Sequence, residues 1–87
     1  MKNNELFFYR SSGIEKHNDG SFTLFGYVEN KNEEEVARYK MRYIDYNVEQ
    51  AIRKFQIDLK EFAELLEENN ILTNEAYLNY KHTLQKG

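Results

Sequence analysis

The stretch Ala37–Gln50, ARYKMRYIDYNVEQ, contains the end of one periodic pattern and the start of another. Its first half alternates apolar or aromatic residues with basic ones, and the basic positions are Arg38, Lys40 and Arg42. A two-residue period predicts a strand over residues 37–45, with one dry face and one basic face. A helix is the competing interpretation, because aromatic residues here also recur at helical spacing. The many β-favouring residues and the unbroken alternation favour the strand.

The second half of the stretch predicts the start of a helix. Asn47 is a preferred N-cap residue, and Gln50 stands three positions later, as in a capping box. Apolar residues then recur at intervals of three and four up to Leu66, which predicts a long amphipathic helix over 48–68. Asn69 and Asn70 end it. Thr73 is placed to cap a short helix over 74–85, and we expect the two helices to form an antiparallel hairpin.

Upstream of the quoted stretch the pattern is that of short strands. Residues 5–10 form an apolar run that Ser-Ser-Gly at 11–13 would end, and residues 14–28 contain Asn-Asp-Gly at 18–20 between two β-favouring segments. Asn-Asp-Gly is typical of a tight hairpin turn. The sequence therefore predicts an α+β fold, in which a small antiparallel sheet of three or four strands, with a β-hairpin at 14–28, is covered by the two helices.

Aromatic residues are concentrated in the predicted sheet. The chain has six Phe and seven Tyr, and nine of these precede residue 47. Alternation within 21–28 places Phe25 and Tyr27 on the face opposite the apolar one. A sheet covered on one side usually keeps its other side polar, so Phe25 and Tyr27, together with Phe8, form a candidate protein interface. Folding of these rings under the second helix is the alternative.

The basic residues Arg38, Lys40 and Arg42 form a candidate contact for nucleic acid or for an acidic partner. They would stand about 7 Å apart along one face of the strand. Two observations weigh against nucleic acid. Tyr39 and Tyr43 point to the other face, whereas proteins that bind single strands combine rings and cations on one surface, and the acidic loop at 33–35 would repel phosphate.

Composition limits the classes of protein that remain. The 87 residues predict a single domain, 1–87, and the absence of Cys excludes disulfides and thiolate chemistry. No metal-binding or phosphate-binding motif is present, and His17 and His82 are far apart in polar surroundings. We therefore expect no enzyme activity, no cofactor, no metal and no small-molecule substrate. The short apolar run near the start predicts neither a signal peptide nor a membrane span, which favours a cytoplasmic location.

The functional prediction is a small non-catalytic protein-interaction or regulatory module that associates with itself, as a homodimer, or with another protein through the aromatic sheet surface. One alternative is a nucleic-acid-binding accessory protein that uses the basic strand face. Another is a phage- or plasmid-encoded inhibitor of a host protein, suggested by a coding bias typical of AT-rich genomes and by the acidic second half of the long helix.

Overall fold

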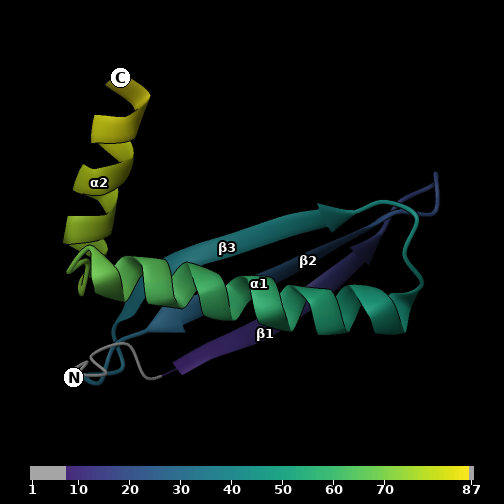
Figure 1. Cartoon of the computed structure of the whole chain (residues 1–87), viewed down its shortest axis with the longest axis horizontal. Helices are drawn as coiled ribbons and strands as arrows, with labels where there is room; N and C mark the ends of the chain where they lie inside the picture. The colour runs from purple at the N-terminus through teal and green to yellow at the C-terminus, as the bar shows by residue number, and fades with distance from the viewer. Residues whose placement is uncertain (1–7, 87) are drawn as a thin grey trace.

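The computed structural model describes residues 8–86 and confirms the α+β prediction. Three strands come first and two helices follow (Figure 1). The sheet is antiparallel in the order β1-β2-β3. The bounds of the elements are β1 Phe8–Lys16, β2 Phe22–Glu29, β3 Glu35–Tyr43, α1 Val48–Glu68 and α2 Asn74–Lys86.

The first strand differs from the prediction. Ser-Ser-Gly at 11–13 does not end a strand, because β1 runs through it, and the register with β2 shifts between Ser11 and Gly13. One residue is thus accommodated as a β-bulge, which an edge strand tolerates well. The predicted strands at 5–10 and 14–17 are therefore one strand, and residues 5–7 lie outside the described part of the chain.

The two turns of the sheet are built by short polar side chains. Gly20 adopts a φ of 88°, and the N–H of His17 donates to the carbonyl of Ser21 at 2.9 Å, which confirms the predicted hairpin turn. In the second turn, the buried Asn30 accepts hydrogen bonds from the backbone N–H groups of Asn32 and Glu34 at 2.9 and 3.1 Å. Residues 31–34 are exposed, as expected for a solvated loop, and these bonds order the loop as a turn. β3 consequently begins at 35, two residues earlier than predicted.

β3 also ends earlier than the predicted 37–45. Asp45 has a φ of 66°, in the left-handed region, so the chain leaves the sheet after Tyr43. Asn47 and Gln50 then form the predicted capping box, with bonds of 2.9 and 3.1 Å in the two directions. Helix α1 has the predicted bounds.

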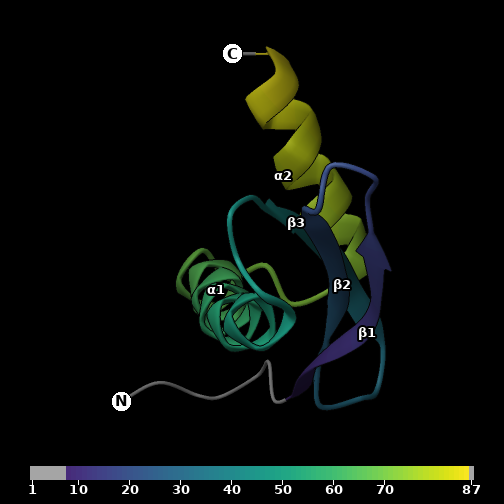
Figure 2. The same cartoon turned by 90° about the vertical axis from the view of Figure 1, so that its right-hand side faces the viewer.

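The sheet and α1 form two layers, with the core between them (Figure 2). β2 is the central strand, and its buried Leu24 and Val28 face α1. Gly26 lies between them, and a Cβ placed there would be 2.9 Å from Leu59 and 3.0 Å from Phe55. The missing side chain thus lets α1 pack directly on the backbone of β2. Tyr39 extends the core by stacking on Phe62, with ring centroids 4.6 Å apart.

The second helix does not run back along α1, so the predicted antiparallel hairpin is wrong. α2 turns away beyond the edge of β3 (Figure 1). Asn70 adopts a φ of 58°, which redirects the chain, and Ile71 is buried in the core. The Asn74 amide then donates to the carbonyl of Val36 at 2.9 Å, and the Asn30 amide donates to that of Leu72 at 2.8 Å. These bonds tie the start of α2 to the sheet, and its contact with α1 includes Tyr77, which packs edge-on against Phe62 with ring centroids 6.0 Å apart.

Candidate binding face of the sheet

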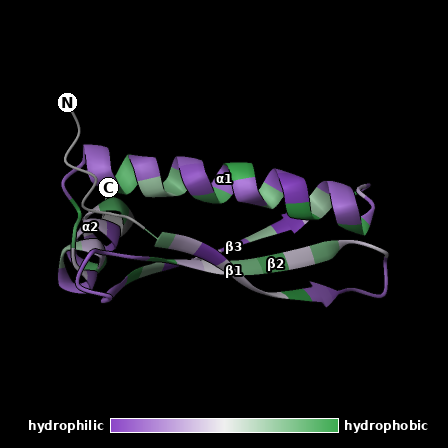
Figure 3. Cartoon of the chain, turned by 90° about the horizontal axis from the view of Figure 1, so that it is seen from below, coloured by the Kyte–Doolittle hydropathy of each residue, from purple (hydrophilic) through white to green (hydrophobic). Residues whose placement is uncertain are grey.

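One face of the sheet is packed against α1, and none of the described elements lies on the other face, which we call the open face (Figure 3). Cross-strand partners in a sheet share a face. Phe25 of β2 is paired with Lys40 of β3, and Tyr27 is paired with Arg38 on one side and with Arg10 of β1 on the other. The centre of the open face therefore combines two rings with three cations, and we call these five residues the ring–cation cluster.

Four of the five cluster residues, together with Glu35, line a hollow of about 600 Å³, whereas Arg10 is not among its lining residues. Phe25, Tyr27, Arg38 and Lys40 line it, and so does Gly13, the partner of Phe25 on β1. A Cβ at Gly13 would lie 4.0 Å from the Phe25 ring, so the lack of a side chain leaves the edge of this ring uncovered. Phe25 and Tyr27 are themselves half-buried between their neighbours. A flat group entering the hollow would meet aromatic rings with cations beside them.

This placement changes one step of the sequence-based reasoning. Tyr39 and Tyr43 do face α1, as the alternation predicts. The rings that accompany Arg38 and Lys40 come from the neighbouring strand instead, through the register of β2 and β3. The inference that the basic face lacks aromatic residues was therefore wrong, because it considered one strand at a time.

The cations of the open face differ in how they are held. The Arg38 guanidinium makes an ion pair of 2.9 Å with Glu35, and its side chain is 82% exposed. Lys40 and Arg10 have no ion-pair partner among the described residues. Exposed pairs such as Arg38–Glu35 contribute about 0–1 kcal/mol, so an incoming anion can replace Glu35 at low cost.

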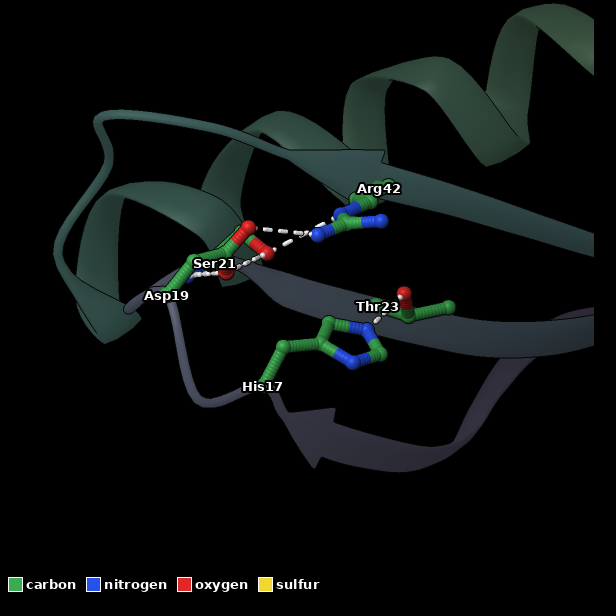
Figure 4. A network of polar contacts seen from close by, with 5 residues as sticks. All are labelled: His17, Asp19, Ser21, Thr23 and Arg42. Carbon is green, nitrogen blue, oxygen red and sulfur yellow. Dashed lines mark hydrogen bonds and ion pairs between the residues drawn. The ribbon is translucent and has the colours of Figure 1, made fainter.

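Arg42, by contrast, belongs to a polar network at the hairpin turn (Figure 4). It donates to Asp19 at 2.6 Å and to the hydroxyl of Ser21 at 2.9 Å. Asp19 also accepts from the Ser21 hydroxyl at 2.6 Å and from the Ser21 backbone at 2.9 Å. These Ser21 bonds, with the charge of Arg42, lower the pKa of Asp19 from 3.8 to about 2. Of the three predicted basic contacts, Arg42 is thus the one already used to hold the turn.

The network contains Ser, His and Asp, but it is not arranged for nucleophilic catalysis. A serine nucleophile needs a base beside its hydroxyl. Here the imidazole Nε2 of His17 lies 2.6 Å from the Thr23 hydroxyl, and Ser21 bonds to Asp19 instead (Figure 4). His17 is half-buried rather than a bare surface residue. The lack of enzyme activity stays a prediction.

The remaining candidate interface residue, Phe8, shares the open face with Phe25 and Tyr27 and is 45% exposed. It stands opposite Glu29, at the end where Glu35 also lies. Glu15 occupies the other end, opposite Thr23. The open face therefore has a basic, aromatic centre, with acidic side chains at both ends.

Comparison with known proteins adds no relative: no family model, curated protein or solved structure matches the chain. Within residues 8–86, no helix has the length and apolar character needed to cross a membrane. The same residues contain no group of three His, Asp or Glu side chains placed to hold a metal ion.

Proposed function

We propose that this chain is a non-catalytic binding module that works through its open sheet face, and that its ligand is single-stranded nucleic acid. The observation that carries the proposal is the cross-strand pairing of Phe25 with Lys40 and of Tyr27 with Arg38. Proteins that hold single strands without sequence preference stack bases on aromatic rings and neutralise the backbone with nearby cations.

The spacing of the two rings favours a single strand over a duplex. Side chains two residues apart on a strand stand about 6.8 Å apart. Bases in a duplex are stacked about 3.4 Å apart, so their faces are covered. A single strand can spread its bases to twice that distance and place one on Phe25 and one on Tyr27.

The test is a titration of the ¹⁵N-labelled protein with an eight-residue oligothymidylate at low salt. We expect amide shifts on β2 and β3 around the cluster, and weaker binding of a duplex of equal length. Phe25→Leu keeps apolar volume but removes the ring, and since one stacked base contributes about 1–3 kcal/mol, affinity should fall at least about fivefold. Shifts confined to other surfaces, or an unchanged affinity for Phe25→Leu, would refute the proposal.

Charge provides a second measurement on the same complex. Three cations on a single strand give a slope of log K against log salt of about −2, and neutralising one reduces its magnitude by about 0.7. Lys40→Gln should therefore flatten the salt dependence. Lys60→Gln, on the exposed side of α1, is the matched control and should leave the slope unchanged.

A protein partner on the open face is the second candidate, favoured by the exposure of Phe8 beside the cluster. Self-association centred on the cluster is less well suited, because a two-fold axis brings a patch against its own copy. Arg10, Arg38 and Lys40 would then be buried against like charges. Light scattering at tens of micromolar tests the predicted homodimer. A strict monomer would exclude the homodimer, whereas a dimer that dissociates in the Phe8→Ser variant would support it.

A further inference from the structure

A second surface lies on the other side of β1, between this strand and α1. It is a groove of about 730 Å³, lined by Tyr9 and Ser11 of β1 and by Arg53, Ile57 and Lys60 of α1, among others. We propose that this groove binds an extended peptide segment of another protein, one that carries an acidic side chain on either side of an apolar one.

The backbone of β1 provides the first part of the argument. Within residues 8–86, β2 is the one strand that pairs with β1, so no described strand lies along the outer edge of β1, and every residue of β1 is exposed. The bulge at 11–13 divides β1 into two regularly paired segments, and the groove lies along Tyr9–Ser11 in the first of them. An exposed strand edge can accept an additional strand from a peptide. The other edge of the sheet differs, since the Asn74 side chain bonds to Val36 there.

The side chains of α1 determine which peptide fits. Arg53, Ile57 and Lys60 stand at positions i, i+4 and i+7, so they share one side of the helix. Ile57 is 54% exposed and Tyr9 is 39% exposed, which gives the groove an apolar centre. Arg53 and Lys60 place a positive charge at each end of it. An apolar peptide side chain flanked by carboxylates matches this order.

The acidic residues near the groove leave these charges available. Arg53 has a long, largely exposed ion pair of 3.7 Å with Glu49. Lys60 makes no ion pair with any residue in 8–86. Exposed Glu61 and Glu64 follow Lys60 on α1.

The lengths also agree. Seven residues of α-helix rise about 10.5 Å, and peptide positions i and i+4 in a strand are about 13.6 Å apart. The flexible Arg53 and Lys60 side chains cover this difference. A segment of the pattern acid-x-apolar-x-acid would thus direct three alternate side chains at Arg53, Ile57 and Lys60, while its backbone pairs with β1.

A second copy of the chain fits this groove poorly. Antiparallel pairing of two β1 strands about a two-fold axis would place the two α1 helices side by side on the same layer. Arg53 and Lys60 would then face the Arg53 and Lys60 of the other copy, and like charges would repel. The partner is therefore a different, acidic segment.

The experiment uses the full chain and the peptide Ser-Glu-Thr-Val-Thr-Glu-Ser, acetylated and amidated. We expect amide shifts in residues 8–11 and 53–60, and intermolecular Hα contacts with β1. Replacing both Thr by Pro keeps the charge but removes two backbone donors, and should abolish these contacts. A peptide with Lys in place of Glu should not bind.

Variants separate this groove from the open face. Lys60→Glu replaces an attraction by a repulsion and should weaken peptide binding about fivefold, whereas Lys40→Glu, the matched control, should leave it unchanged. Lys40→Glu should lose oligothymidylate binding, whereas Lys60→Glu should keep it. The two proposals can therefore fail independently of each other. Failure of the peptide to bind, equal binding of the Pro peptide, or nuclear Overhauser contacts that place residues 1–7 or a second copy in the groove would each overturn the inference.

Discussion

The substitution Gly26→Ala tests the packing that brings the two layers together. The added Cβ would lie 2.7 Å from the Arg10 carbonyl oxygen, 2.9 Å from Leu59 and 3.0 Å from Phe55. Leu59 and Phe55 are fully buried, so they have little room to move. The Arg10 oxygen belongs to the backbone of β1 and can only shift together with that strand. All three neighbours therefore resist the methyl group.

The magnitude follows from two opposing terms. Inserting a methyl group into a well-packed core costs about 1–3 kcal/mol. Replacing Gly by Ala recovers about 0.4–1 kcal/mol by restricting the unfolded chain, because φ at Gly26 lies outside the left-handed region. The free energy of unfolding should thus fall by about 1–2 kcal/mol, which corresponds to a Tm lower by roughly 5 to 15 °C in a domain of this size.

Urea titration followed by circular dichroism at 222 nm measures the change, and Gly13→Ala is the matched control. A Cβ at Gly13 meets only the Phe25 ring, at an ordinary 4.0 Å. The free energy of unfolding of the Gly13→Ala protein should be unchanged or slightly raised. The added methyl group narrows the hollow, so this variant should bind the oligonucleotide more weakly. A Gly26→Ala protein as stable as the parent would show that α1 does not pack against β2 in this way.

Two further predictions concern polar contacts. The buried Tyr43 hydroxyl donates to Asp58 at 2.5 Å, and burial, together with this bond, raises the pKa of Tyr43, so the phenol stays protonated. Tyr43→Phe should lower the free energy of unfolding by about 1.5–3 kcal/mol in a urea titration. A decrease below about 0.5 kcal/mol would contradict the bond. Asp19 has a lowered pKa of about 2 against 3.8 when unperturbed, so its stabilising contribution is present above pH 4 and is lost as the pH falls towards 2. Asp19→Asn should remove this part of the acid dependence of unfolding, and an NMR titration midpoint near 4 for Asp19 would disprove the assignment.

The helical half of the fold could be predicted well because its signals are local. A capping box and an apolar repeat lie within one continuous segment, and both Asn47 and Gln50 act as their spacing indicates. The direction of α2 was not predictable in this way. It depends on hydrogen bonds from Asn74 to Val36 and from Asn30 to Leu72, each of which joins residues about 40 positions apart. No local pattern records such pairs.

The open face shows the same difference between local signals, which the sequence contains, and contacts between distant segments, which it does not. Alternation within each strand correctly indicated which side chains share a face of that strand. It did not indicate which residues of neighbouring strands would be adjacent, because that depends on register. The register of β2 and β3 places Lys40 opposite Phe25, and the bulge in β1 places Gly13 beside the same ring. The hollow therefore arises from three segments, none of which has a binding motif of its own.

The net charge of −3 does not oppose a nucleic-acid ligand, because the charges are separated in space. Exposed Glu61, Glu64 and Glu68 lie on α1, and Figure 1 looks down the shortest axis, 21 Å long, with α1 in front of the sheet. The ring–cation cluster is on the far face of that sheet. At physiological ionic strength, interactions between exposed charges are screened over about 8 Å, so a phosphate on the open face responds mainly to Arg10, Arg38 and Lys40. In the proposed complex, the nearby carboxylates of Glu15, Glu29 and Glu35 would restrict the length of strand on the open face.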